Sequence, residues 1–162
     1  MSDSERRRVD AEAYRLAMRR TAASVAVITA AHEGRIHGMT ATAMTSVSVE
    51  PPTLLVVVNR TTRTHPFIRK SGRFAVNVLA MGQEEIARRF AAGVENQFEG
   101  IAYDLHAAEV PIIAGSVAAF VCIATDAFDV ATHTIFIGEV EEAQHTDLPP
   151  LLYYDGRFID LG

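Results

Sequence analysis

The chain has 162 residues, a formal net charge of −5 at pH 7 and 49% hydrophobic residues, so a single ordered domain is expected. The acidic balance argues against nucleic-acid binding, which needs a basic surface to neutralise phosphates. No run approaches ~18 apolar residues and the charged N-terminus does not resemble a secretory signal, so we expect a cytoplasmic protein with no membrane segment.

The N-terminal region divides into a polar arm and a helix. Residues 1–9, with the basic run at 6–8, are predicted to form a flexible arm, and residues 10–162 to form the domain. Asp10 is suited to cap a helix that runs to about Thr21. Helical spacing gives this helix an apolar face and a charged face, formed by Ala13, Tyr14, Ala17 and Met18 and by Arg15 and Arg19 respectively.

Strand patterns follow the first helix. Val25–Thr29 is short and β-branched, and Gly34 is predicted to be the pivot of a turn. Ser46–Val49 alternates and is predicted to be half buried, whereas the apolar run Thr53–Val58 is predicted to be covered on both sides. Pro51 and Pro52 separate these two strands because proline cannot donate to a ladder.

The middle of the chain mixes helices and strands. A polar connection at 59–63 precedes a short helix near Pro66, since proline suits a first helical turn. Alternating apolar residues predict a strand at 74–78. A second clear helix is expected over Gln83–Ala91, with Ile86 and Phe90 on its buried face and a stop at Gly93.

The C-terminal part is predicted to be mostly strand. Residues 94–115 are loop-rich with a weak strand at 103–107, and the single cysteine, Cys122, lies in an apolar run and is predicted to be buried. Long strands are expected over Ser116–Thr125 and Thr134–Glu142, and a hairpin over Leu151–Tyr154 and Phe158–Leu161 that turns at Asp155-Gly156. Seven or eight strands with three helices favour a mainly β, antiparallel barrel over alternating βαβ units.

Several common sites are missing from the sequence. It contains no G-x-G-x-x-G, no P-loop, no H-E-x-x-H and no G-x-S-x-G motif. The six histidines are scattered, so a metal site would need ligands from distant segments and none is expected.

Three polar segments remain as candidate ligand sites. Gly38–Ser46 carries small residues and hydroxyls that suit a planar ring, although an ordinary Thr-rich strand would look similar. Asn59–His65 combines hydroxyls and two arginines without acidic residues, which suits a phosphate or a solvated loop. Ala131–Thr134 places a histidine at a strand start, where it could contact a nicotinamide ring or simply satisfy local hydrogen bonds.

Taken together, these segments resemble the short-chain flavin reductase family, the reductase components of two-component flavin monooxygenases. The resemblance runs from Ala17 to Leu161 and rests on the order and spacing of short stretches, each weak alone. These stretches are Val25–Thr29, Gly38–Ser48, Pro51-Pro52, Asn59–Pro66, Phe74–Leu79, Gln83–Phe90, Gln97–Gly100, Gly115-Ser116, the histidine segment and Pro150–Phe158.

The resemblance implies an antiparallel Greek-key split β-barrel with a few flanking helices. It implies a homodimer that holds FMN or FAD near the subunit interface, takes hydride from NADH or NADPH, and supplies an oxygenase. By position, the ring would be lined by Met39, Thr40, Ala41 and Thr42. The flavin phosphate would be held by Asn59, Arg60, Thr61, Thr62 and Thr64, and His133 would lie close to the nicotinamide.

The chain departs from the family at two places. Ala131-Thr132-His133 stands where the family usually has Gly-Asp-His, so any role of that aspartate is lost, and Ser24 stands where many members have glycine. Three alternatives stay open from the residues. They are another split-barrel flavoprotein (a ferric reductase or a pyridoxamine-phosphate-oxidase-like enzyme), a non-enzymatic flavin- or heme-binding module, and a scaffold with no cofactor.

Overall fold

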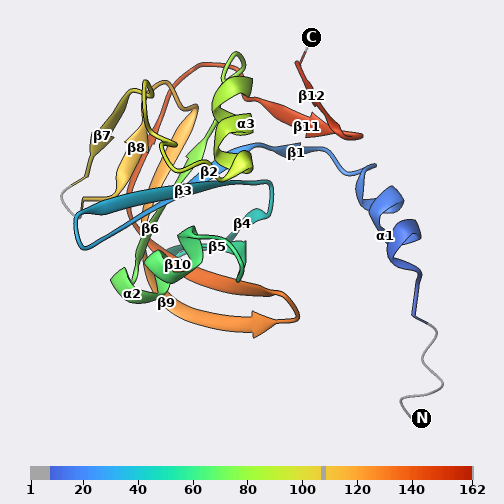
Figure 1. Ribbon diagram of the computed structural model, residues 1–162, viewed down its shortest axis with the longest axis horizontal. Helices are drawn as coiled ribbons and strands as arrows, with labels where there is room; N and C mark the ends of the chain where they lie inside the picture. The colour runs from blue at the N-terminus through green and yellow to red at the C-terminus, as the bar shows by residue number, and fades with distance from the viewer. Residues whose placement is uncertain (1–7, 107–108, 162) are drawn as a thin grey trace.

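The computed structural model describes residues 8–106 and 109–161 as a mainly β fold (Figure 1). Most of the predicted N-terminal arm, residues 1–7, lies outside the described residues. The helices are α1 (Ala11–Met18), α2 (Thr64–Ser71) and α3 (Glu84–Ala92). The strands are β1 (Ala23–Ser24), β2 (Ala26–His32), β3 (Arg35–Ala41), β4 (Met44–Val49), β5 (Pro52–Asn59), β6 (Arg73–Val78), β7 (Tyr103–Leu105), β8 (Pro111–Ile113), β9 (Ala118–Val130), β10 (His133–His145), β11 (Leu152–Tyr154) and β12 (Arg157–Ile159).

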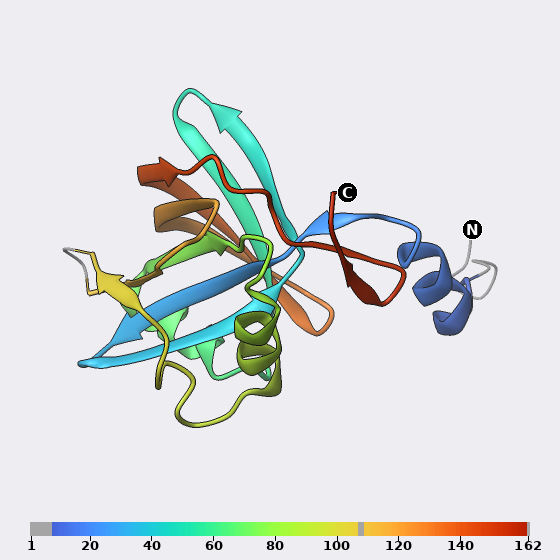
Figure 2. The same ribbon diagram turned by 90° about the horizontal axis from the view of Figure 1, so that it is seen from above.

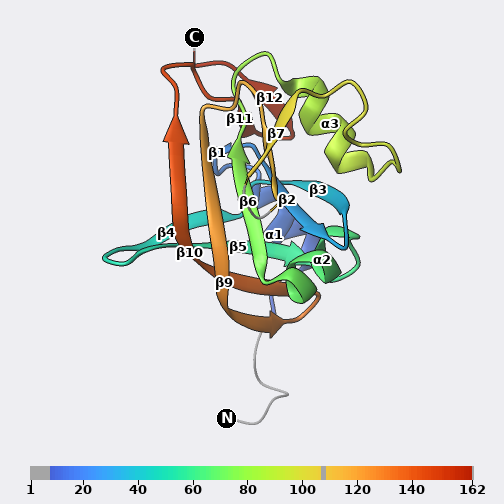
Figure 3. The ribbon, with the colours of Figure 1, turned by 90° about the vertical axis from the view of Figure 1, so that its left-hand side faces the viewer.

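Seven strands form the main sheet in the order β3-β2-β6-β9-β10-β5-β4, and every neighbouring pair is antiparallel. The sheet curls into a split barrel, with β3 and β4 as its two edges and only Thr42 and Ala43 between them in sequence. The long strands β9 and β10 bend along their length, as Figure 3 shows, and their pairing shifts register at two places. The outer edge of β3 pairs with no other strand of this sheet among the described residues.

The two faces of the sheet carry separate cores. The interior core includes Ile28, Val56, Phe74 and Phe136, and Ile68 of α2 closes it from one end. The outer core lies under α3 and is formed by Val25, Val27, Leu79, Ala87, Phe90, Ile113 and Leu151. Side chains along β2 pack alternately in the interior core and in the outer core, because successive side chains of a strand point to opposite faces.

Close contacts in the sheet require a glycine at one position of β10. A Cβ atom built on Gly138 would lie 2.5 Å from Cζ of Phe74 and 2.8 Å from Cβ of Cys122. Cys122 is fully buried, as predicted, and this burial raises the pKa of its thiol to about 12. Strands β6, β9 and β10 can pack this tightly only because Gly138, which lies against Phe74 and Cys122, has no side chain.

The helix α1 stands apart from the barrel. In Figures 1 and 2 it lies beyond β1 and the β11–β12 hairpin, and none of its residues is buried. Asp10 occupies the N-cap position as predicted, but its side chain makes no capping hydrogen bond. None of the described helices is long and apolar enough to cross a membrane.

Several expectations about the elements need correction. The first helix ends at Met18 instead of about Thr21. Ser46–Val49 is not half buried, because β4 is an edge strand with Val47 52% and Val49 81% exposed. Thr53–Val58 alternates between buried and half-buried residues, since only its inward face meets the core. The loop-rich region contains two short strands instead of one, and the described residues contain twelve strands, more than the seven or eight predicted.

Candidate functional site

The first predicted segment lies on the edge strand β3 and just beyond it. Met39 and Ala41 are partly buried and pack against the interior core. Thr40 points to the opposite face, where its hydroxyl donates to the Ala87 carbonyl of α3 at 2.6 Å. Thr42 follows the strand and is exposed. The Thr40 side chain is therefore already bonded to the protein, and a ligand would meet this segment through its backbone and through Thr42.

The outer edge of β3 is already paired at one residue. The Gly38 N–H donates to Oε1 of Gln97 at 3.1 Å, and Nε2 of Gln97 donates back to the Gly38 carbonyl at 2.8 Å. Peptide groups of alternate residues in a strand point to the same edge. The backbone groups of Thr40 consequently face the same outer side as those of Gly38, whereas Thr42 lies beyond the strand and its carbonyl accepts from the Met44 N–H at 3.1 Å.

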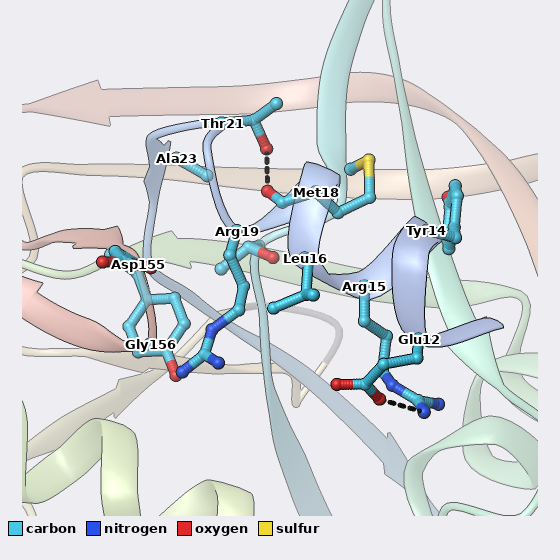
Figure 4. A pocket seen from close by; sticks show the side chains of 12 residues that line it. Glu12, Tyr14, Arg15, Leu16, Met18, Arg19, Thr21, Ala23, Asp155 and Gly156 are labelled. Atoms are coloured by element: carbon cyan, nitrogen blue, oxygen red, sulfur yellow. Dashed lines mark hydrogen bonds and ion pairs between the residues drawn. The ribbon is translucent and has the colours of Figure 1, made fainter. Parts of the chain in front are cut away.

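A hollow that includes Thr42 in its lining lies beside α1, and Figure 4 shows the side chains of α1 that face it. It has a volume of about 510 Å3, within the range of roughly 300–1,000 Å3 that is typical of small-molecule sites. Its walls come from α1, from the β11–β12 hairpin and from the start of the barrel. The lining residues are Glu12, Tyr14, Arg15, Leu16, Met18, Arg19, Thr21, Ala23, Thr42, Tyr153, Asp155 and Gly156. Thr42 thus connects the strand edge to a space large enough for part of a cofactor.

The second predicted segment is a folded turn between β5 and α2. Oδ1 of Asn59 accepts hydrogen bonds from both the N–H and the hydroxyl of Thr61, each at 2.9 Å. The Thr62 hydroxyl donates to the Asn59 carbonyl at 2.8 Å. These bonds fix the turn before any ligand arrives, as is common for Asx turns.

Arg60 and Thr64 make hydrogen bonds to residues outside this turn. The Arg60 guanidinium donates to the Ala131 carbonyl, and the Arg60 N–H donates to the Thr132 carbonyl at 3.1 Å. A guanidinium has five N–H donors, so Arg60 keeps others for an anion. Thr64 is fully buried and its hydroxyl contacts Nδ1 of His37 at 2.8 Å. The phosphate contact that the resemblance implies for Thr64 would therefore require this side chain to become exposed.

The third predicted segment lies beside the second. His133 is the cross-strand partner of Asn59 in the β5–β10 ladder, so the two candidate segments meet at one end of the barrel. Its ring is half buried, and Nδ1 contacts the Thr132 hydroxyl at 2.8 Å. Thr132 thereby contacts the imidazole from the position where the family usually has an aspartate.

A network of hydrogen bonds and one ion pair links α2, β9 and β10 at this end of the barrel. The Thr134 hydroxyl donates to Asp129 at 2.6 Å, so Nε2 of His65 must be the donor in its 2.8 Å contact with the same hydroxyl. Arg69 pairs with Asp129 at 2.6 Å. The hydrogen bond from Thr134 lowers the pKa of Asp129, and burial together with Arg69 lowers the pKa of His65. His65 is accordingly neutral at pH 7.

A family comparison decides the classification of the chain. The family described as flavin reductase like domain matches residues 18–162. The chain belongs to the flavin reductase-like family. The sequence-based resemblance is therefore confirmed, and so is the mainly β, antiparallel split-barrel fold.

Relatives of this flavin reductase-like chain cover nearly its whole length. The reductase component of the 4-nitrophenol 4-monooxygenase/4-nitrocatechol 2-monooxygenase of Rhodococcus opacus is 37% identical over 150 residues, covering 93% of this chain and 80% of the relative. An NADH-dependent flavin reductase of a Rhodococcus species is 32% identical over 150 residues, covering 91% and 84%. The structure of a Streptomyces globisporus C-1027 NADH:FAD oxidoreductase in complex with NAD and FAD fragments superposes with a TM-score of 0.89 at 33% identity, covering 97% and 98%.

Sequence reasoning missed two polar residues around the candidate site, Gln97 and His37, and gave no role to a third, His65. Gln97 bonds the edge of β3, His37 bonds the buried Thr64, and His65 bonds Thr134 behind His133. Their partners are distant in sequence, by 59, 27 and 69 residues respectively. No local pattern predicts these contacts, although Gln97 and His65 both fall in stretches that carry the family resemblance.

Proposed function

We propose that this protein is an NAD(P)H:flavin oxidoreductase that reduces FMN or FAD and supplies the reduced flavin to a partner oxygenase. The match to the flavin reductase-like family over residues 18–162 carries this proposal. It is supported by relatives whose names describe an NADH-dependent flavin reductase and reductase components of monooxygenases. The geometry agrees, because an open strand edge, a phosphate-suited turn and a histidine are all present.

The residues present suit a flavin. We propose that Met39, Thr40, Ala41 and Thr42 bind the isoalloxazine ring, with the outward backbone groups of β3 pairing with its polar edge and Thr42 leading into the 510 Å3 hollow. We propose that Asn59, Arg60, Thr61 and Thr62 hold the phosphate, while the buried Thr64 contacts His37 of β3. When bound, the flavin supplies an acceptor for hydride from a dihydronicotinamide.

His133 is proposed to orient the nicotinamide ring. Hydride transfer requires close stacking of donor and acceptor, at about 3–3.5 Å between reacting atoms, and little acid–base assistance. A half-buried imidazole contacted by Thr132 can offer a flat, fixed surface to a neutral ring. We therefore assign His133 to dinucleotide binding and not to proton transfer.

The proposal includes a homodimer in the cytoplasm. α1 has no buried residue, and the edge strand β4 exposes Val47 and Val49. A second subunit seated on these surfaces would cover apolar area that a monomer leaves in water. The cytoplasmic location fits a hydride donor that is a soluble metabolite of that compartment.

The test is to mix the purified protein with NADH and either FMN or FAD and to follow dinucleotide oxidation. Flavin-dependent oxidation, followed by transfer of the reduced flavin to an oxygenase component, is the expected result. Efficient transfer to a ferric chelate but not to an oxygenase would favour a ferric reductase. Bound flavin or heme without NADH oxidation would favour a non-enzymatic binding module, and a protein that takes up no cofactor would be a scaffold.

A further inference from the structure

Gln97 is a buried amide for which the proposed reaction has no use. It lies in the loop after α3 and is 2% exposed, yet both polar atoms of its side chain are bonded to a single residue, Gly38. The amide therefore pairs with the edge of β3 as a neighbouring strand would. A residue that needed only to fill space here would be apolar, because burying an amide costs free energy unless both of its groups are bonded.

The helix before Gln97 holds the same strand at two further points. The Thr40 hydroxyl donates to the Ala87 carbonyl of α3. Phe90 packs so closely on Gly38 that an added Cβ would lie 2.9 Å from its ring. Three contacts from α3 and its following loop thus fall on two alternate residues of β3, Gly38 and Thr40.

We propose that Gln97 is a positioning residue that fixes the outer edge of β3 for flavin binding, an inference that rests on the proposed function. Its amide occupies the outward peptide groups of Gly38 and leaves those of Thr40 as the next ones along the edge of β3. The ring is thereby given a fixed starting point along the strand. Without the amide, the Gly38 peptide groups lose their partner and the edge strand is free to shift or to recruit water.

The same chain supplies a matched control. Gln83, at the other end of α3, also uses its side chain as a two-point backbone clamp: Oε1 accepts from the Ala80 N–H at 2.9 Å and Nε2 donates to the Ala114 carbonyl at 2.9 Å. It contacts neither β3 nor the proposed flavin segment. A purely structural role for Gln97 predicts the same consequences for Gln97→Met and Gln83→Met.

The experiment measures FMN affinity from quenching of flavin fluorescence, on full-length protein held well below its unfolding temperature. We expect Gln97→Met to raise the FMN dissociation constant about tenfold or more, since it removes two hydrogen bonds that order the binding edge. Hydrogen exchange at the Gly38 amide should accelerate in the flavin-free variant. Gln83→Met should lower Tm while leaving FMN affinity within about twofold of the wild-type value.

Steady-state kinetics separate this role from general damage. The KM for flavin should rise in Gln97→Met, while the KM for NADH and kcat change little, because the nicotinamide contact at His133 lies on another strand. Gln97→Glu keeps the length and the acceptor for the Gly38 N–H. Gln97→Glu loses only the donor to the Gly38 carbonyl, so, if Gln97→Met does not fold, a smaller rise in the FMN dissociation constant must still be found in Gln97→Glu.

Two outcomes would overturn the inference in distinguishable ways. If the wild type binds FMN and a folded Gln97 variant binds it equally well, the positioning role is wrong and the proposed function stands. If the wild type binds no flavin at all, the proposed function is wrong and this inference fails with it.

Discussion

At the scale of single residues, His133 gives the sharpest kinetic prediction. If His133 stacks on the nicotinamide as proposed, removing its ring should weaken dinucleotide binding by about 3- to 10-fold, the range expected for an aromatic contact. We predict that His133→Ala raises the KM for NADH by this factor and changes kcat by less than about twofold. His145→Ala, at the exposed far end of β10, is the control and should match the wild type. A large fall in kcat at saturating NADH would show that His133 takes part in the chemical step.

His37 makes the stability of the protein depend on pH. Burial, followed by the positive charge of Arg63, lowers the pKa of His37 below its usual 6.5, and Nε2 has no partner among the described residues. The unfolded chain therefore binds a proton more readily than the folded one. The contribution of neutral His37 to the free energy of unfolding is fully present above about pH 6.5. It is lost as the pH falls through and below that value.

This titration can be checked by thermal unfolding. The Tm of the wild type should fall between pH 7.5 and pH 5.5, and the fall should be smaller in His37→Gln, which cannot be protonated. Parallel pH dependence of Tm in the two proteins would contradict the assignment to His37.

At the scale of the elements, the tight packing of β6, β9 and β10 predicts a specific cost. A methyl group at Gly138 would overlap the Phe74 ring and Cβ of Cys122, so Gly138→Ala should destabilise the protein by about 1–3 kcal/mol, as overpacking usually does. Chemical denaturation measures this loss. Combining Gly138→Ala with Phe74→Leu should recover part of it, because the smaller side chain makes room. An unchanged denaturation midpoint in Gly138→Ala would mean that β6, β9 and β10 can move apart without loss of stability.

The same elements show what the sequence could predict. Local chemistry was sufficient at Asp155-Gly156, where both residues adopt the positive φ that a tight hairpin needs, and at Gly93, which ends α3 in the left-handed conformation. It failed at Ser46–Val49, because alternation shows that a strand has two different faces but not whether a neighbour covers either one. The lengths of β9 and β10 were predicted too short, because their pairing continues through polar and charged residues beyond the apolar stretches.

The candidate site was predicted in pieces that only the fold could assemble. The three polar segments were recognisable by composition, but the pairing of His133 with Asn59 depends on strand register between residues 74 positions apart. Burial of Thr64 and the clamp from Gln97 depend on which neighbours α2 and the loop after α3 meet. These long-range contacts have no local sequence pattern.

At the scale of the whole molecule, the proposed homodimer predicts that apolar surface exposed in the single chain is buried between two subunits. Val47 and Val49 on the edge strand β4 are exposed in the single chain, as is every residue of α1. We expect sedimentation equilibrium to show a dimer, and Val49→Lys to weaken it because a charge would be buried at the interface. A wild type that sediments as a monomer at all concentrations tested would refute the dimer.

The measurement that tests the account most directly is an equilibrium titration of the folded protein with FMN and, in parallel, with riboflavin, followed by flavin fluorescence. If an open β3 edge holds the ring and the Asn59–Thr62 turn holds the phosphate, one flavin should bind per chain, and FMN should bind more tightly than riboflavin by about tenfold or more, the free energy of a charge-assisted contact. Failure of the folded protein to bind either flavin saturably would contradict the whole account.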